Sequence, residues 1–365
     1  MKKFNSLLAI AAASALALSA CSGGDSKSGS EEKTAEGSDY KACIVSDAGG
    51  WDDKSFNESA KIGLDQAVKE LGVKHNEAES SSDADFAPNV QAMVSDGCQL
   101  VIGVGFLLAP AITKAAQENT DLSFALVDSG FSDSDGNAVE VDNGRALLFN
   151  TQEAAFLAGY VAAGATKTGT VATFGGQPIP SVQIFMDGFA DGVKAYNEAK
   201  GKSVKVLGWD KDNQSGAFVN SFDDQALGKT QAQQFIDQGA DIIMPVAGPV
   251  GLGAAAAAKA AGNVMIIGVD SDWYEANPDY KEITLTSVMK GIDASVLDTI
   301  KAGVKDKFDS APFVGTIANG GVKIAPFHDL ESAVPDDVKA DVEKLTEQIK
   351  SGELKVESKH ATAVN

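Results

Sequence analysis

From Tyr40 onward, short runs of apolar, mostly β-branched residues alternate with longer segments of helical length. The apolar runs are continuous, as in strands that are buried on both faces of a sheet. They cover residues 43–45, 100–104, 124–127, 170–174, 204–207, 242–246, 264–269 and 283–288. The helical segments cover residues 57–71, 87–95, 109–119, 153–165, 182–200, 224–238, 251–261 and 292–302. This β-α order predicts parallel α/β architecture, with ligands at the carboxyl ends of the strands.

The length of this region predicts two lobes, because about 325 residues exceed what one hydrophobic core usually holds. We expect lobe 1 to comprise residues 40–148 and 289–318, and lobe 2 to comprise residues 149–288 and 319–365. Residues 312–327 read as two short strands and a further connection between the lobes, and residues 335–351 as a final amphipathic helix.

The N-terminus predicts secretion. Lys2 and Lys3 precede an apolar run, 7–20, that is too short to span a bilayer, so residues 1–20 read as a signal peptide. The run ends in Leu-Ser-Ala-Cys at positions 18–21, which resembles the bacterial lipobox and predicts lipidation of Cys21; the alternative is an ordinary cysteine after a generic secretion signal. Residues 21–39 then form a lipid anchor and flexible tether, which places the folded part at the cell membrane on its extracytoplasmic face.

Charge and composition exclude several functions. With 51 acidic and 30 basic residues, the formal net charge of −21 disfavours nucleic acid as a partner. The three histidines and three cysteines are far apart in the sequence, so we expect no metal site. We expect no cofactor either, because the phosphate-binding, dinucleotide-binding and serine-hydrolase motifs are all incomplete or missing. The chain therefore reads as a binding protein and not as an enzyme.

Two cysteines remain in the folded part. Cys43 opens the first apolar run and Cys98 lies just before the second, so the two residues are placed near the start of adjacent strands. Outside the cytoplasm they can form a disulfide bond. The alternative is a pair of buried free thiols.

Polar and glycine-rich loops follow most of the predicted strands. Asp47 lies in the first of these loops, Phe106 after the second strand, Asp128 after the third, and Gly248 and Asp270 after later ones. This arrangement predicts a binding cleft rimmed by loops. Taken singly, the same residue types also form turns and helix caps.

Five segments, at residues 47–57, 150–159, 246–248, 267–272 and 285–290, together resemble the basic membrane protein family of bacterial lipoproteins. Its best understood members are purine nucleoside receptors related to the treponemal membrane lipoprotein C. The resemblance implies a periplasmic-binding-protein type I fold, with two Rossmann-like lobes joined by three crossovers and a ligand cleft between them. It also implies an ABC permease and its ATPase as partners.

The resemblance assigns aromatic residues to both sides of a base. Phe56 falls at the stacking position of the first lobe and Phe222 at that of the second, with Phe218 as the alternative to Phe222. Trp51 and Trp273 depart from the family pattern and are expected to reshape the mouth of the cleft or to extend the stacking.

Polar residues complete the implied site. Asp47, Asn57 and Asp128 line up with residues that read the base. Asp270 and Lys290 line up with residues that hold the ribose hydroxyls, for which a carboxylate and an ammonium are chemically suited. Gly248 lets the backbone approach the ligand closely.

We therefore expect a lipid-anchored substrate-binding protein of an ABC importer that captures a nucleoside, with a purine implied, by lobe closure. One alternative is a receptor for a sugar or another small polar ligand. Another is a surface interaction or sensor lipoprotein that is not coupled to transport, since we find no permease-docking signature in the sequence.

Overall fold

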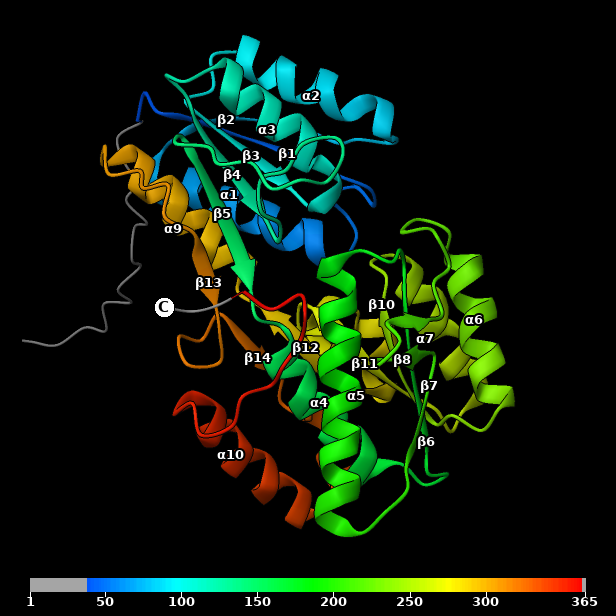
Figure 1. Cartoon of the computed structure of the whole chain (residues 1–365). Coiled ribbons are helices and arrows are strands. Elements are labelled where there is room, and N and C mark those ends of the chain that lie inside the picture. Colours follow the sequence, from blue (N-terminus) through cyan, green and yellow to red (C-terminus); the bar gives the residue numbers. More distant parts are fainter. Residues whose placement is uncertain (1–37, 363–365) are drawn as a thin grey trace, which may run out of the picture. The chain divides into compact units, whose positions relative to one another are not determined.

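A computed structural model describes residues 38–362 of the chain, which form two six-stranded sheets and one small hairpin (Figure 1). The signal peptide, the lipidation site Cys21 and most of the tether that the sequence predicts lie outside the described residues. Within residues 38–362, no helix has both the length and the apolar character needed to cross a membrane.

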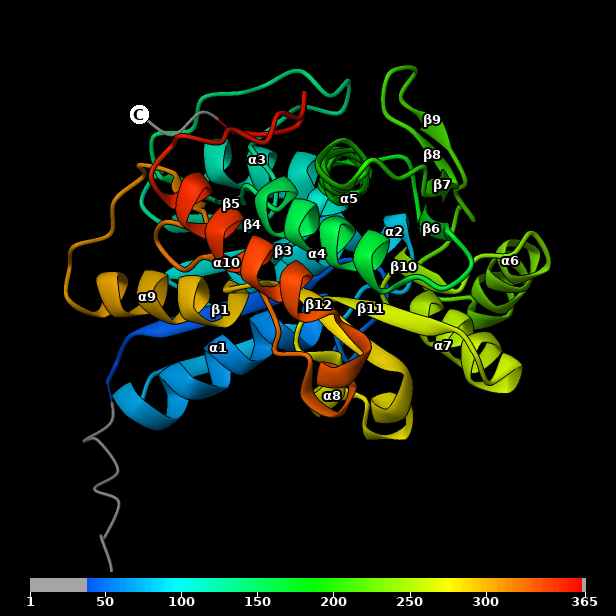
Figure 2. The ribbon, with the colours of Figure 1, turned by 90° about the horizontal axis from the view of Figure 1, so that it is seen from below.

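The first sheet is entirely parallel, with the strand order β13-β5-β4-β3-β1-β2. Its strands are β1 (Lys41–Ser46), β2 (Lys74–Ala78), β3 (Leu100–Val104), β4 (Ser123–Val127), β5 (Gly144–Phe149) and β13 (Phe313–Gly315). Helices α1 (Phe56–Leu71) and α9 (Ile292–Val304) pack against each other on one face, and α2 (Asp83–Ser95) and α3 (Ala109–Glu118) lie on the other (Figure 2). Side chains alternate between these faces, so Ile44 packs with the α1 side and Val45 with the α2 side.

The second sheet repeats this order as β14-β12-β11-β10-β6-β7, with only β14 antiparallel to its neighbour. Its strands are β6 (Thr170–Gly175), β7 (Lys205–Leu207), β10 (Ile242–Val246), β11 (Met265–Asp270), β12 (Thr284–Lys290) and β14 (Val322–Ile324). Its helices are α4 (Gln152–Ala165), α5 (Pro180–Lys200), α6 (Gln225–Asp237), α7 (Val250–Ala261), α8 (Trp273–Ala276) and α10 (Asp336–Lys350). The hairpin β8 (Trp209–Asp210) and β9 (Ser215–Gly216) and the 3-10 turns η1 (Phe106–Leu108), η2 (Pro278–Ile283) and η3 (His328–Ala333) complete the described fold.

The chain passes between the two sheets three times, from β5 to α4, from β12 to α9 and from β13 to β14. The predicted parallel α/β architecture and the three crossovers are confirmed. One boundary needs correction: Met289 and Lys290, which we expected in lobe 1, belong to β12 of the second sheet. The remaining division of residues between lobes stays a prediction.

The predicted strands and helices correspond to observed ones, but β2, β5, the short helix α8 and the β8–β9 hairpin were not predicted. Strand β2 is an edge strand with the sequence KHNEA and mostly exposed or half-exposed side chains, so it contains no apolar run. The hairpin strands have only two residues each, which is too short for a periodic pattern.

Cys43 and Cys98 form a disulfide bond, with a Cα–Cα distance of 5.9 Å. Cys43 lies in β1 and Cys98 lies two residues before β3, the strand that pairs with β1. Of the two alternatives left open by the sequence, the structure contains the bridge. It links residues 55 positions apart within the first sheet and its loops.

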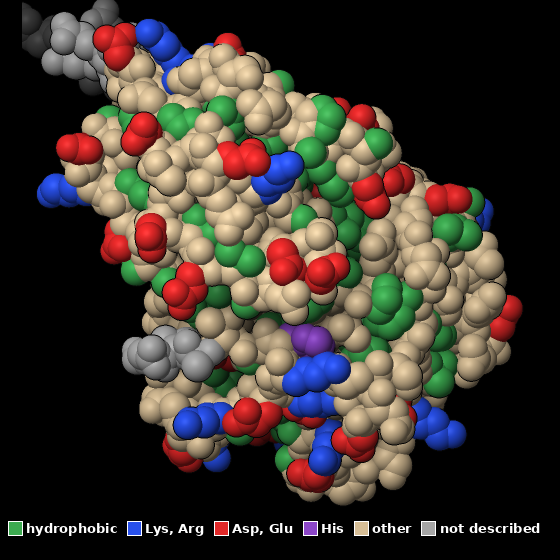
Figure 3. Space-filling model, turned by 45° about the horizontal axis from the view of Figure 1, so that its top comes forward, with side chains coloured by type: hydrophobic (Ala, Val, Ile, Leu, Met, Phe, Trp, Pro, Cys, Tyr) green, Lys and Arg blue, Asp and Glu red, His purple; other side chains and the backbone are tan. Residues whose placement is uncertain are grey.

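Charged side chains of both signs are spread over the face drawn in Figure 3. Acidic side chains are scattered across this face, and basic ones form no patch larger than a small cluster beside the one visible histidine. This face offers no broad basic surface of the kind that binds a phosphate backbone.

Candidate functional site

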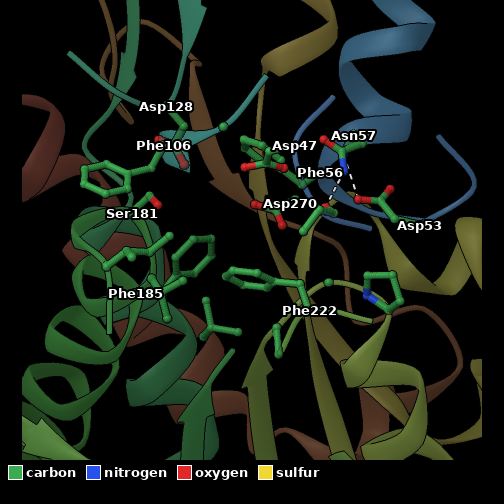
Figure 4. A pocket seen from close by; sticks show the side chains of 18 of the residues that line it. Asp47, Asp53, Phe56, Asn57, Phe106, Asp128, Ser181, Phe185, Phe222 and Asp270 are labelled. Carbon is green, nitrogen blue, oxygen red and sulfur yellow. Dashed lines mark hydrogen bonds between the residues drawn. The ribbon is translucent and has the colours of Figure 1, made fainter. Parts of the chain in front are cut away.

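The carboxyl ends of the two sheets face each other across a pocket (Figure 4). It contains about 530 Å³ of space between side chains, part of it open to solvent. All nine ligand-binding residues that the sequence predicts line this pocket: Asp47, Phe56, Asn57, Phe106, Asp128, Phe222, Gly248, Asp270 and Lys290. Their contact with a ligand remains a prediction.

Two aspartates occupy corresponding positions in the two sheets. Asp128 directly follows β4 and Asp270 ends β11, and both have positive φ, of 59° and 67°. Such a backbone is uncommon for residues other than glycine and often occurs at functional sites. Each aspartate sits in a Val-Asp-Ser sequence, at 127–129 and 269–271. The strained turn directs each carboxylate to the interface between the sheets.

Lys290, the last residue of β12, lies between these two carboxylates. Its Nζ is 2.5 Å from Asp128 Oδ2 and 3.1 Å from Asp270 Oδ1, and the Lys290 side chain is only 2 % exposed. The same Nζ lies 5.3 Å from the ring centre of Phe56 and 4.4 Å from that of Phe185. Because Asp128 comes from the first sheet and Lys290 from the second, the ion pair joins the two sheets. The structure thus groups Asp128 with Lys290 and Asp270, whereas the resemblance placed it with the base-reading residues.

Burial and charge shift the pKa values in this cluster. Burial raises the pKa of Asp128 to about 6, more than the attraction to Lys290 lowers it. Burial alone would lower the pKa of Lys290, but the attraction of Asp128 and Asp270 outweighs it, so the net shift is upward. Asp270 Oδ1 accepts no hydrogen bond, although it is paired in charge with Lys290. The cluster therefore has a charged lysine and, at Asp270 Oδ1, a carboxylate oxygen that can accept a hydrogen bond from a ligand hydroxyl beside its ion pair with Lys290.

Aromatic rings form the apolar walls. Phe56 begins α1, Phe222 precedes α6, Phe106 begins η1 and Phe185 lies in α5. Figure 4 shows the rings of Phe185 and Phe222 directed toward each other, with the ring of Phe106 farther out beside Ser181. Flat, apolar ligand groups can pack between such rings.

The two candidates for the second aromatic position have different surroundings. Phe222 lines the pocket, whereas Phe218 packs edge-to-face on Trp209, with ring centres 5.9 Å apart, and against Gly175. Of Phe218 and Phe222, only Phe222 lines the pocket, and its stacking on a ligand stays a prediction.

The expectation that Trp51 and Trp273 shape the cleft mouth is wrong. Both are buried core residues, at 9 % and 1 % exposure, and neither lines the pocket. The Trp273 indole Nε1 donates to Val269 O and its ring packs against Gly268 and Gly251, so it supports the end of β11 from outside the pocket.

Further polar groups line the pocket at the start of α1 and in the loop after β1. Asn57 Nδ2 donates to Ala48 O at 2.9 Å, which leaves the buried Asn57 Oδ1 without a hydrogen-bond partner. Burial raises the pKa of Asp47 well above its usual value, and the nearby Asp53 carboxylate raises it further. A Cβ at position 105 would overlap Asp47 Oδ2, so only glycine allows this carboxylate its position.

Asp53, Ser181 and Phe185 also line the pocket but were not predicted. Asp53 lies inside segment 47–57, one of the five that resemble the family, so the resemblance could have identified it. Ser181 and Phe185 lie in the first turns of α5, and their sequence has no feature that separates them from ordinary helix residues.

The ligand-free protein is expected to become more stable by a few degrees in Tm as the pH is lowered from about 7.5 to about 5.5. Asp53 and Asp128 have folded-state pKa values of about 6, above the ordinary 3.8, so the folded state binds protons before the unfolded state does. Protonation of these two aspartates therefore adds to the free energy of unfolding as the pH falls through 6, and it adds nothing at higher pH. Calorimetry at the two pH values measures it. Asp128→Asn should flatten the response, whereas Asp133→Asn, at an exposed site whose pKa is lowered by Asn137, should not. A Tm that falls on acidification would contradict this prediction.

Comparison with known proteins identifies relatives that match over most of their length. The model of a family described as ABC transporter substrate-binding protein PnrA-like, named Bmp, matches residues 41–360. The chain is 33 % identical to the ABC transporter nucleoside-binding protein BmpA of Lactococcus lactis subsp. cremoris (strain MG1363), over 98 % of this chain and 99 % of that protein. It is also 33 % identical to an uncharacterized lipoprotein of Pyrococcus abyssi (strain GE5 / Orsay), over 77 % of this chain and 66 % of that protein.

Among solved structures, an ABC transporter system solute-binding protein from Aeropyrum pernix K1 matches with a TM-score of 0.77 and 27 % identity, covering 87 % of this chain and 92 % of that one.

Within residues 38–362, no group of three or more His, Cys, Asp or Glu side chains is arranged to hold a metal ion.

Proposed function

This chain belongs to the PnrA-like family of ABC transporter substrate-binding proteins, and from this premise we propose that it captures a nucleoside between its two lobes for import. The fold is that of a type I periplasmic-binding protein. Members of the family bind substrates for ABC transporters and are not enzymes, so the partners of the chain are a permease and its ATPase.

The observation on which this proposal rests is the combination of one ionic end and aromatic walls in a single pocket. A nucleoside has a flat base and a ribose with neighbouring hydroxyls. Lys290 can donate to sugar oxygens and Asp270 Oδ1 can accept a hydrogen bond from a hydroxyl, while the aromatic rings suit the base. A ligand with both parts matches the pocket better than a sugar or a free base.

Phe56 and Phe222 suit the base because they approach from different lobes. Each stack of a base on an aromatic ring contributes about 1–3 kcal/mol. Since Phe56 belongs to α1 of the first lobe and Phe222 to the loop before α6 of the second, both stacks form together only when the lobes are closed.

Asp47 and Asn57 are placed to read the edge of the base. The unpartnered Asn57 Oδ1 needs an N–H donor, which purines such as guanine and hypoxanthine offer at N1. Gly248, with φ of 53°, lines the pocket without a Cβ, so its backbone can lie against the ligand. The nucleoside-binding name of the Lactococcus relative supports the same ligand class.

A thermal-shift panel on refolded, ligand-free protein tests the proposal. At 100 times Kd, a ligand adds about 2.7 kcal/mol of stability. We expect a rise in Tm with guanosine, inosine or adenosine and none with nucleotides or sugars. A rise with sugars alone would favour a sugar receptor, and a flat panel would favour an interaction or sensor lipoprotein; both results would overturn nucleoside capture.

We propose further that Cys21 anchors the protein to the extracytoplasmic face of the membrane, as the lipoprotein name of the Pyrococcus relative suggests. Cys21→Ser is expected to release the protein from the membrane fraction and to abolish incorporation of labelled palmitate. Cell fractionation and intact mass of the mature protein measure these effects. A Cys21→Ser protein that still carries lipid would refute the anchor.

A further inference from the structure

The hydroxyl of Ser55 is bonded in an unusual way for its position. Ser55 is the N-cap of α1, where a serine normally accepts a hydrogen bond from a backbone N–H of its own helix. Here its side chain makes no such bond. Instead Ser55 Oγ lies 2.9 Å from Val269 O and 3.1 Å from Asp270 Oδ2, both in β11 of the other sheet.

Asp53 takes over the capping of α1. Its Oδ1 accepts from the backbone N–H groups of Ser55 and Glu58, at 2.9 and 3.0 Å, and its Oδ2 accepts from that of Asn57 at 2.8 Å. The helix therefore does not need the hydroxyl of Ser55, which is free to act across the lobe interface.

The bond from Ser55 restrains the Asp270 carboxylate. Asp270 Oδ2 lies 3.1 Å from Ser55 Oγ, whose single proton is shared between this oxygen and Val269 O, while Oδ1 lies 3.1 Å from Lys290 Nζ. The two oxygens are thus held from different lobes, which limits rotation of the carboxylate. A second bond crosses in the opposite direction, from Ser271 Oγ to Lys54 O at 3.0 Å. Ser55 is completely buried and does not line the pocket.

From this geometry we infer that Ser55 is a positioning residue, which on lobe closure orients Asp270 toward the ligand hydroxyls without touching the ligand itself. The inference rests on the proposed function, in which Asp270 holds the ribose. It gives the closed form a contact that the open form lacks, so closure and correct placement of the carboxylate occur together.

The test compares Ser55→Ala with the parent protein on two ligands, inosine and 2′,3′-dideoxyinosine. If Ser55 acts through Asp270, the substitution should raise Kd for inosine about tenfold, mainly by faster dissociation, because a hydrogen bond to a charged group is lost. The dideoxy ligand has no hydroxyls for Asp270 to hold, so it should lose only the contribution of the bond to closure, and its Kd should rise clearly less than that of inosine.

Ser59→Ala is the matched control, because Ser59 Oγ donates to Ser55 O, so its hydrogen bond stays at the start of α1. Ser55→Cys keeps the buried volume with a much weaker donor and should reproduce the result if the alanine variant fails to fold. Equal losses on both ligands, or no loss on inosine, would overturn the role of Ser55. Failure of the parent protein to bind inosine would instead refute the proposed function.

Discussion

Replacing Lys290 with methionine is expected to raise the nucleoside Kd at least about 30-fold, because truncating one partner of a buried, hydrogen-bonded charge pair across an interface costs about 2–5 kcal/mol of binding free energy and each 1.4 kcal/mol is tenfold in Kd. The Lys290 side chain lies between Asp128 of the first sheet and Asp270 of the second and is almost fully buried. Without it, two carboxylates face each other across the closing interface, and the ligand hydroxyls lose their donor. Methionine has a similar length, so the change removes the charge with little change in packing.

Titration calorimetry of the variant with inosine measures this effect. Lys301→Met is the control, since Lys301 pairs with Glu70 between two partly exposed side chains, an arrangement that contributes little to stability. A Lys290→Met protein that binds inosine within threefold of the parent protein would contradict the role of this cluster.

The second large effect is expected from Phe222→Ala, which should weaken nucleoside binding at least about tenfold through the loss of one base stack. Phe56→Ala should have an effect of the same size, because its ring forms the other side of the predicted sandwich. The measurement is the Kd of inosine for each variant, together with the Tm of the ligand-free protein.

Phe218→Ala provides a matched control only four residues away. Phe218 packs on Trp209 outside the pocket, so its loss should lower Tm and leave Kd nearly unchanged. Phe222→Ala should raise Kd strongly and change Tm less than Phe218→Ala does. If Phe218→Ala weakened binding more than Phe222→Ala, the assignment of the stacking residue would be wrong.

The central strands could be predicted from sequence because both faces of each are buried, as in β3 and β10, where every residue is apolar and buried. Strand β2 could not, because an edge strand keeps polar side chains such as His75 and Glu77 in contact with solvent. Hydrophobic periodicity reports burial, and it fails where a strand is held mainly by backbone hydrogen bonds.

The pocket residues could be predicted because loops after parallel strands converge, and the family resemblance selected among them. The contacts that these residues make with one another could not be predicted from the sequence. Asp128 and Lys290 are 162 positions apart, and Ser55 and Asp270 are 215 apart, so their contacts depend on how two sheets approach each other. The repeated Val-Asp-Ser sequence was the one local signal that Asp128 and Asp270 occupy equivalent places.

For the aromatic residues too, the sequence does not indicate which side chains face the pocket. Phe218 and Phe222 lie in one stretch without regular structure between β9 and α6, and their spacing does not indicate which ring faces the ligand. Trp51 and Trp273 stand in or beside the binding loops in sequence, yet both rings fill the core behind those loops. Proximity to a binding loop in sequence therefore does not predict the direction of a side chain.

Calorimetric titration of the refolded protein with guanosine and with guanosine 5′-monophosphate tests nucleoside capture most directly. The pocket contains four aspartates, Asp47, Asp53, Asp128 and Asp270, and one lysine, so it should disfavour a phosphate. We predict one guanosine per chain with Kd at or below about 1 μM, and monophosphate binding at least about 100-fold weaker. Absence of guanosine binding by folded protein, or equal binding of the monophosphate, would contradict the account.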